Sequence, residues 1–154
     1  REKFAEQYGV KSVDNFYALR YFNVYGPGEQ NKGNMASVAF QAHRKGEFKL
    51  FPGNPKRDFV YIKDVVSATI HPIFNHIIPG IYEVGSGEER TFEDVLDLMG
   101  VKYSYRDGVE VPNGYQYYTK ANKIEFMTGW EPIYNLENGI KEYKEYLEIW
   151  NYWL

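Results

Sequence analysis

The sequence contains no cysteine among its 154 residues. Disulfide frameworks, cysteine-ligated metals and thiol nucleophiles are therefore excluded, and the absence fits a reducing, cytoplasmic environment. No uninterrupted apolar run approaches the roughly 18 residues that a membrane-spanning helix needs. There is no excess of positive charge either, because 18 Lys and Arg stand against 21 Asp and Glu. We therefore expect neither nucleic acid nor a membrane as the main partner.

The composition that remains is typical of one globular domain, with 44% hydrophobic and 25% charged residues. Aromatic residues make up 18% of the chain, and 15 of them are Tyr. Because Tyr and Trp combine an apolar ring with a polar group, they suit ligand clefts and subunit contacts as well as cores. The three histidines have no metal-ligand spacing, so no metal site is predicted.

Apolar segments of strand type alternate with segments of helical periodicity, which predicts an α/β architecture. Residues 1–9 resemble the end of an amphipathic helix, and a short helix is expected to end near Gly129. Pro72 is expected to kink its helix or end it early. We expect strands over 15–24, 48–51, 58–62, 80–84 and 102–105, and helices over 35–45, 64–75, 91–100 and from 135 onward.

Two helix starts carry recognisable capping signals. Thr91 and Asp94 have the spacing of a capping box, and Asn135 can accept from the first-turn amides of the last helix. That helix carries one apolar stripe at helical spacing, formed by Leu136, Ile140, Tyr143, Leu147 and Trp150.

Three segments stand out as candidates for a site. Residues 20–27 read RYFNVYGP, residues 56–60 read KRDFV and are followed by Tyr61 and Asp64, and residues 82–87 read YEVGSG. From composition alone, RYFNVYGP favours a buried strand and a turn. The alternative is that it presents Asn23 at the carboxyl edge of a sheet, where ligands of open α/β folds bind.

In this order, the three segments resemble the motifs of the extended short-chain dehydrogenase/reductases that act on nucleotide-sugars, the NAD-dependent epimerase/dehydratase family. Glu83 stands where that family usually has Asn. Residues 31–40 (NKGNMASVAF) are similar to a stretch of the ADP-heptose 6-epimerases within the family. Those enzymes invert C6 of ADP-D-glycero-D-manno-heptose by transient oxidation with bound NADP, in lipopolysaccharide core synthesis. A related 4-epimerase or 4,6-dehydratase is the alternative.

The resemblance implies a role for individual residues. Lys32 matches the second proton donor or acceptor of the 6-epimerases, and Val24 and Lys32 match contacts to the cofactor; otherwise Lys32 is a solvated loop residue. Arg57 matches a diphosphate-binding arginine, for which its planar guanidinium is suited; the alternative is a surface pair with Asp58. The other implied substrate contacts are Asn23, Asn34, Gln41, Phe51, Pro52, Gly53, Asn54 and Tyr115, of which Tyr115 has packing as its alternative.

Two motifs of the family are absent from this sequence, namely the glycine-rich cofactor turn and the Tyr-x-x-x-Lys pair. We therefore expect residues 1–154 to be the C-terminal, substrate-binding half of a nucleotide-sugar epimerase, with the dinucleotide-binding part missing. The expected fold is the C-terminal part of an extended Rossmann-type fold with a small α/β substrate domain. The intact enzyme would be an NADP-dependent homo-oligomer, with NAD left open, whereas the chain alone would be inactive or a nucleotide-sugar-binding remnant.

Overall fold

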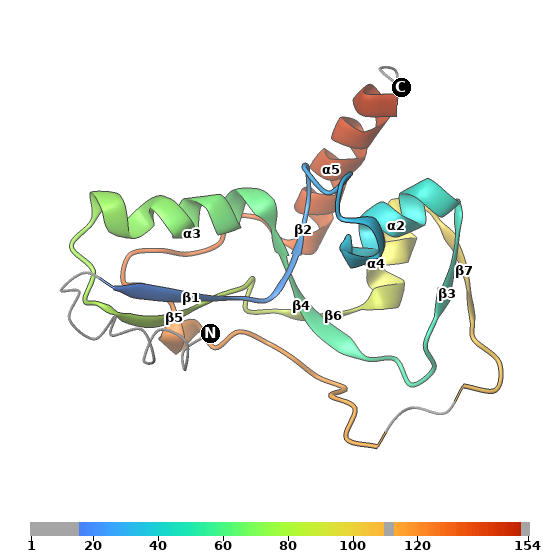
Figure 1. Ribbon diagram of the computed structural model, residues 1–154, viewed down its shortest axis with the longest axis horizontal. Coiled ribbons are helices and arrows are strands. Elements are labelled where there is room, and N and C mark those ends of the chain that lie inside the picture. The colour runs from blue at the N-terminus through green and yellow to red at the C-terminus, as the bar shows by residue number, and fades with distance from the viewer. Residues whose placement is uncertain (1–15, 110–112, 152–154) are drawn as a thin grey trace.

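The computed structural model describes residues 16–109 and 113–151, so the helix expected over residues 1–9 lies outside the described part. The molecule is elongated, with one lobe built around β1, β5 and α3 and another around β3, β7, α2 and α4 (Figure 1). A small central sheet joins the lobes, and the C-terminal helix α5 projects from the middle of the molecule. Strands and helices alternate, as the sequence predicts.

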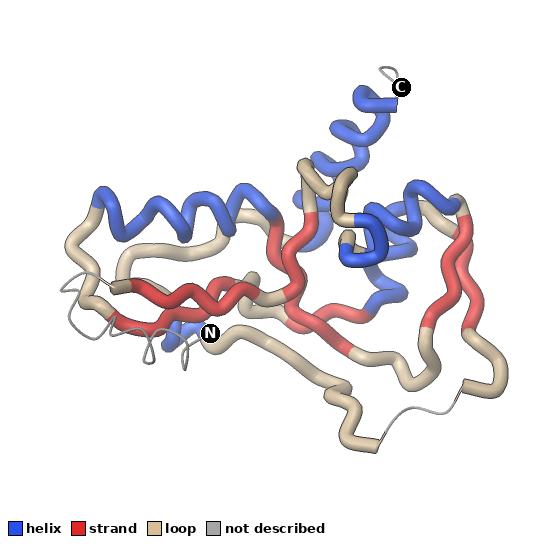
Figure 2. The backbone as a smooth tube through the Cα atoms, in the orientation of Figure 1, coloured by secondary structure: helices blue, strands red, loops and turns tan. Residues whose placement is uncertain are grey.

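Within residues 16–109 and 113–151, three small sheets form the framework, and most of their strand pairs are parallel (Figure 2). In the first lobe, β1 (Tyr17–Tyr21) runs parallel to β5 (Gly80–Val84). In the centre, β2 (Asn23–Tyr25) runs parallel to β4 (Lys56–Tyr61), which pairs antiparallel with β6 (Glu89–Thr91). In the second lobe, β3 (Glu47–Leu50) runs parallel to β7 (Lys102–Tyr105).

The strand predicted over 15–24 is in fact two strands that have different partners. The Phe22 N–H donates to the carbonyl of Val84 at 3.1 Å, which ends the pairing with β5. The next residue, Asn23, is already in register with Phe59 of β4. The chain thus crosses from one sheet to another at Phe22, and this crossing places Asn23 and Val24 at the junction of the two lobes.

Two helices start at other residues than predicted, for local reasons. Helix α2 (Val38–Lys45) begins after Ser37, whose hydroxyl accepts from the Phe40 N–H at 3.3 Å; Gly33–Met35 form the separate 3-10 helix η2. Helix α3 (Ile62–Phe74) follows β4 directly, two residues earlier than predicted. It does not end at Pro72 but continues to Phe74. Proline has no N–H to donate to the carbonyl four residues earlier, so the helix passes Pro72 without that hydrogen bond and ends two residues later.

The capping predictions are confirmed. In α4 (Phe92–Met99), the Thr91 hydroxyl accepts from the Asp94 N–H and the Asp94 carboxylate accepts from the Thr91 N–H, both at 2.9 Å. In α5 (Leu136–Asn151), the Asn135 side chain accepts from the Asn138 N–H at 2.9 Å. The buried residues of the predicted stripe are Leu136, Ile140, Tyr143 and Leu147; the side chain of Trp150 lies outside the described part.

The predicted short helix before Gly129 is reduced to the 3-10 helix η3 (Lys123–Glu125), and β6 has no counterpart in the prediction. The main core lies where α2, α4 and α5 meet the central sheet, around Phe40, Val95 and Tyr143. Burial of each such side chain contributes roughly 1.5–3 kcal/mol. This core holds together the elements that carry the site described below.

Asp58 fastens the central sheet to the loop that follows β5. Its buried carboxylate accepts from the N–H groups of Ser86, Gly87 and Ala121 at 2.7, 2.8 and 3.0 Å. Gly85 is required in this loop, because a Cβ there would lie 2.8 Å from Oδ2 of Asp58. Two amide groups of the GSG segment, those of Ser86 and Gly87, are thus occupied by the protein's own carboxylate.

Candidate active site

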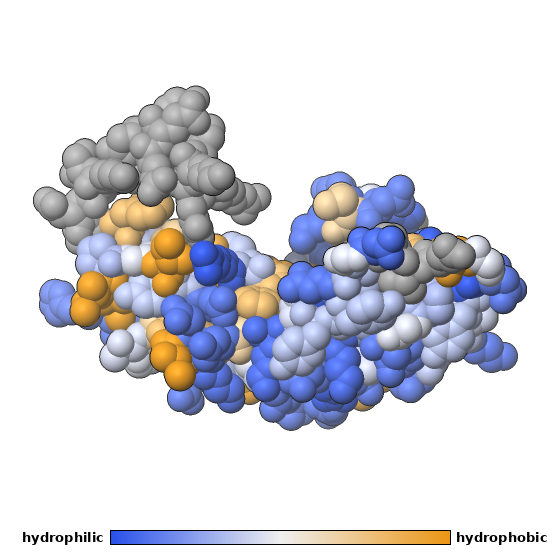
Figure 3. Space-filling view, turned by 90° about the horizontal axis from the view of Figure 1, so that it is seen from below, coloured by the Kyte–Doolittle hydropathy of each residue, from blue (hydrophilic) through white to orange (hydrophobic). Residues whose placement is uncertain are grey.

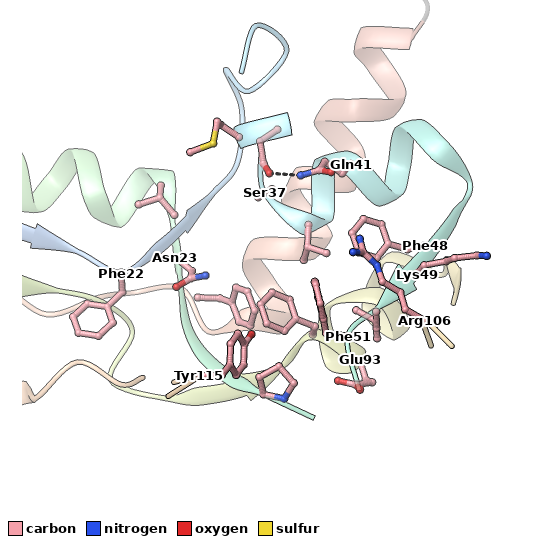
Figure 4. Close-up of a pocket in the computed structure, with 18 residues that line it drawn as sticks. Phe22, Asn23, Ser37, Gln41, Phe48, Lys49, Phe51, Glu93, Arg106 and Tyr115 are labelled. Atoms are coloured by element: carbon pink, nitrogen blue, oxygen red, sulfur yellow. Dashed lines mark hydrogen bonds between the residues drawn. The ribbon is translucent and has the colours of Figure 1, made fainter. Parts of the chain in front are cut away.

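The candidate site is a cavity of about 610 Å³ between the central sheet and the lobe of β3, β7, α2 and α4, lined by 18 residues (Figure 4). It lies between the crossing from β1 to β2, the start of α2, the end of β3 and the start of α4. One part of its wall is aromatic, formed by Phe22, Phe48, Phe51, Phe59, Phe92 and Tyr115. Its polar side chains are Asn23, Ser37, Gln41, Lys49, Glu93 and Arg106.

Five of the residues singled out in the sequence meet in this cavity: Asn23, Val24, Gln41, Phe51 and Tyr115. Gln41 is held in place because its amide nitrogen donates to the carbonyls of Ala36 at 2.8 Å and Asn34 at 3.2 Å. The five residues come from β2, α2, the loop after β3 and the segment that carries Tyr115, which are far apart in the sequence. Their convergence is a property of the fold rather than of any one motif.

Six other predicted residues do not line the cavity: Lys32, Asn34, Pro52, Gly53, Asn54 and Arg57. Arg57 lies close to it, since its guanidinium is 5.4 Å from the centre of the Tyr115 ring. The predicted alternative for Arg57 does not apply, because the Asp58 carboxylate is fully buried and binds backbone amides instead. A cation stacked on a wall residue is well placed for an anionic group at the cavity's edge.

Lys32 precedes η2, in the loop between β2 and α2. Its side chain is 48% exposed, and its Nζ lies 3.8 Å from Oε1 of Glu29. The described residues around Lys32 therefore do not bury it, although burial would favour the neutral amine that a proton acceptor needs.

Glu29 is a residue that sequence reasoning missed. It is only 2% exposed, and its carboxylate accepts from the Ser37 hydroxyl at 2.6 Å, the Ser37 N–H at 2.7 Å and the Tyr143 hydroxyl at 3.1 Å. Burial, together with the charge of Glu29, raises the pKa of Tyr143 well above its usual value. Glu29 thus ties the Lys32 loop to α2 and to α5, and nothing in its sequence neighbourhood signals this role.

Glu93 and Arg106 are two further cavity residues that no motif identified. The Arg106 guanidinium lies 4.5 Å from the centre of the Phe51 ring, and the Glu93 Oε1 accepts from the Tyr105 hydroxyl at 3.0 Å. That hydrogen bond raises the pKa of Tyr105. Figure 4 shows Glu93, Phe51 and Arg106 toward one end of the cavity and Asn23 toward the other.

Taken together, the cavity offers flat aromatic walls, the amide of Asn23 toward one end, and the charged groups of Glu93 and Arg106 toward the other (Figure 4). Such a set suits a ligand with a planar ring, a polar uncharged part and an anionic linker. Among the described residues, no group of three or more His, Cys, Asp or Glu is placed to hold a metal ion. No helix in the same part of the chain is both long and apolar enough to cross a membrane.

The chain is similar to known proteins in sequence and in structure. A family model, the NAD dependent epimerase/dehydratase family, matches residues 2–85. The chain is 33% identical to an ADP-L-glycero-D-manno-heptose-6-epimerase of Fusobacterium nucleatum; the match covers 92% of this chain and 52% of that protein. The chain therefore spans about half the length of this curated relative.

Solved structures of epimerases are also similar to this chain. The Helicobacter pylori ADP-L-glycero-D-manno-heptose-6-epimerase is 32% identical with a TM-score of 0.75, over 95% of this chain and 48% of that one. A Thermus thermophilus UDP-glucose 4-epimerase in complex with NAD is 28% identical with the same TM-score, over 96% and 51%. These likenesses confirm the predicted α/β fold class.

Proposed function

The chain belongs to the NAD dependent epimerase/dehydratase family, and from this premise we propose that it is the C-terminal, substrate-binding half of an ADP-heptose 6-epimerase. In the intact enzyme, ADP-D-glycero-D-manno-heptose would be oxidised transiently at C6 and reduced again on the opposite face. The product would serve heptose incorporation into the lipopolysaccharide core. The family match and the similarity to two 6-epimerases support this assignment.

The observation that carries the proposal is the cavity itself. It gathers Asn23, Gln41, Phe51 and Tyr115, four residues that the resemblance assigns to the substrate. In this proposal the amides of Asn23 and Gln41 bind sugar hydroxyls, and Arg57 beside Tyr115 binds the diphosphate. Hydroxyls and phosphate oxygens are the partners that amide and guanidinium groups prefer.

The turn of residues 51–54 supports the proposal that the nucleotide binds at the end of the cavity where Phe51 lies. Gly53 and Asn54 both have positive φ angles, of 96° and 48°. A Cβ at Gly53 would lie 2.8 Å from the Tyr117 ring, so only glycine lets the turn pack this closely. Asn is among the side chains that accept such a backbone most readily. The turn presents Phe51 toward the cavity, which fits the proposed role of residues 51–54 around the nucleotide.

The proposed cofactor is a nicotinamide dinucleotide, NADP, with NAD as the alternative. When bound, it supplies the acceptor and donor of the hydride. This chain's residues fit one end of it only: Val24 lines the cavity beside Asn23, and would contact the nicotinamide end next to the substrate. In this proposal, the residues that bind the rest of the dinucleotide belong to the upstream half.

That upstream half would also cover apolar surface that the described residues leave open. Four exposed residues follow one face of α3, at positions i, i+4, i+7 and i+8: Val66, Ile70, Ile73 and Phe74. Figure 3 shows further apolar side chains at the same end of the molecule, where Ile78 and Ile81 are exposed. We propose that the dinucleotide-binding half packs there, and that the intact enzyme is a cytoplasmic homo-oligomer.

We propose that Lys32 exchanges a proton with the substrate oxygen when C6 is reduced on the opposite face. In the intact enzyme, Lys32→Ala should lower the rate of 6-epimerisation by about 100-fold or more, the usual contribution of a positioned acid–base group. The absorbance of bound cofactor should be unchanged. Lys141→Ala, an exposed lysine of α5, is the control, and near-normal turnover in Lys32→Ala would refute the assignment.

A UDP-hexose 4-epimerase is the second candidate, favoured by the equal TM-score of the Thermus thermophilus enzyme. Incubation of the intact enzyme with ADP-heptose and with UDP-glucose, followed by separation of the epimers, distinguishes the two. Inversion at C6 of ADP-heptose alone supports the first proposal. Inversion at C4 of UDP-glucose alone supports the second.

A further inference from the structure

We propose that Glu93, Arg106 and Phe51 form a nucleobase subsite that selects a base with an amino group, such as adenine, over one with a carbonyl at the same position. This inference rests on the proposed function, which brings a nucleotide-sugar into the cavity. It adds the residues that choose among nucleotides. The three residues converge toward one end of the cavity, away from Asn23 (Figure 4).

Phe51 and Arg106 provide the flat surface that a base needs. The guanidinium lies 4.5 Å from the centre of the phenyl ring. Arg106 is anchored through its backbone, because its N–H donates to the Leu50 carbonyl at 2.9 Å and so extends the pairing of β3 with β7. Phenyl rings and guanidinium planes both stack on nucleobases, and they do so with any base.

Selectivity among bases must therefore come from a group that forms directional hydrogen bonds, and the carboxylate of Glu93 is such a group. One carboxylate oxygen, Oε1, accepts from the Tyr105 hydroxyl. The other, Oε2, is buried and has no hydrogen-bond partner among the described residues. A buried acceptor without a donor is energetically unfavourable. A donor that enters the cavity with the ligand would remove this cost.

Glu93 can reach such a donor without leaving its place in the first turn of α4. The terminal torsion of a glutamate is broad, so the carboxylate can turn toward the cavity. Tyr105, its present partner, is 49% exposed and able to adjust. Lys49 also lines the cavity, but its ammonium only donates hydrogen bonds and therefore favours a carbonyl, so a preference for an amino group has to come from Glu93.

The chemistry of the carboxylate sets the preference. An ionised carboxylate only accepts hydrogen bonds, so it can bind the 6-amino group of adenine. The carbonyl of hypoxanthine at that position would place two acceptors face to face, and uracil presents a carbonyl as well. The inference is therefore that adenosine diphosphate groups are favoured over inosine and uridine diphosphate groups.

The test is an equilibrium titration of the protein with ADP, IDP and UDP as probes. The unmodified protein should bind ADP about tenfold or more tightly than IDP, as expected for a hydrogen bond to a charged group. In Glu93→Gln the side-chain amide can also donate to a carbonyl, so the ADP-to-IDP ratio should fall below about threefold. Arg106→Leu should weaken binding of all three nucleotides and leave the ratio unchanged.

Glu47→Gln, an exposed carboxylate of β3, is the matched control and should keep the full preference. Circular dichroism checks that each variant is folded, and the ADP-to-IDP comparison on the unmodified protein needs no variant. Equal affinity for ADP and IDP, or a preference that survives in Glu93→Gln, would overturn the inference alone. If none of the three nucleotides binds, the proposed function itself fails.

Discussion

Buried carboxylates in this protein act mainly as acceptors for backbone amides. Asp58 joins β4 to the loops at 86–87 and 121, and Asp64 accepts from the N–H groups of Ile133 and Tyr134, both at 3.0 Å. Burial raises the pKa of Asp64, although the two amides act against it. Each links segments that are far apart in the sequence. Glu93 differs from them, because one of its oxygens lacks a donor within the described part of the chain.

At the residue scale, Glu142 should contribute a pH-dependent part of the stability. Its carboxylate is 2.6 Å from the Lys63 ammonium and accepts from the hydroxyls of Tyr61 at 2.9 Å and Tyr134 at 3.0 Å. The Lys63 contact, with help from the two hydroxyls, holds the pKa of Glu142 below its usual value of 4.5. Because the folded-state pKa is the lower one, this stabilisation is present above about pH 4.5 and is lost as the pH falls through the lowered pKa.

Chemical denaturation at pH 7 and at pH 3.5 measures this contribution. Glu142→Gln should lower the free energy of unfolding at pH 7 by up to about 1 kcal/mol, since the ion pair is partly exposed. The difference from the unmodified protein should shrink at the lower pH. Glu145→Gln, an exposed glutamate of the same helix, is the control; an equal loss at both pH values in Glu142→Gln would refute the assignment.

At the scale of elements, the sequence predicts those strands and helix starts that depend on residues close to them in the chain. The strands 80–84 and 102–105 are flanked by breaking residues, and the caps at Thr91 and Asn135 act within four residues of themselves. The crossing at Phe22 and the strand β6 could not be predicted, because they depend on partners some 30 to 60 residues away. Local propensity cannot show such a change of partner.

The loop that carries Lys32 depends on α5 through one buried hydrogen bond, from Tyr143 to Glu29. Tyr143→Phe removes only that hydroxyl and should lower the free energy of unfolding by about 1.5–3 kcal/mol, the range for a hydrogen bond to a charged group. Tyr146→Phe is the control, because Tyr146 stacks on Tyr143 but is only partly buried. Thermal unfolding measures both; equal losses in the two variants would show that Glu29 does not need this donor.

At the scale of the whole molecule, the candidate site could be predicted only in part. The resemblance identified Asn23, Gln41 and Tyr115, because they belong to recognisable segments. Glu29, Glu93 and Arg106 could not be found that way, since their importance comes from neighbours supplied by other elements. The cavity exists only when the central sheet, the lobe of β3, β7, α2 and α4, and the segment that carries Tyr115 are assembled.

The most direct test of the proposed substrate site is an equilibrium titration with ADP-D-glycero-D-manno-heptose. We expect saturable binding, weakened about tenfold or more in Arg57→Gln, because the diphosphate loses a charge-assisted partner. Arg44→Gln, on the exposed side of α2, should bind as the unmodified protein does. An absence of saturable binding, or equal weakening in the two variants, would contradict the assignment of this cavity to a nucleotide-sugar.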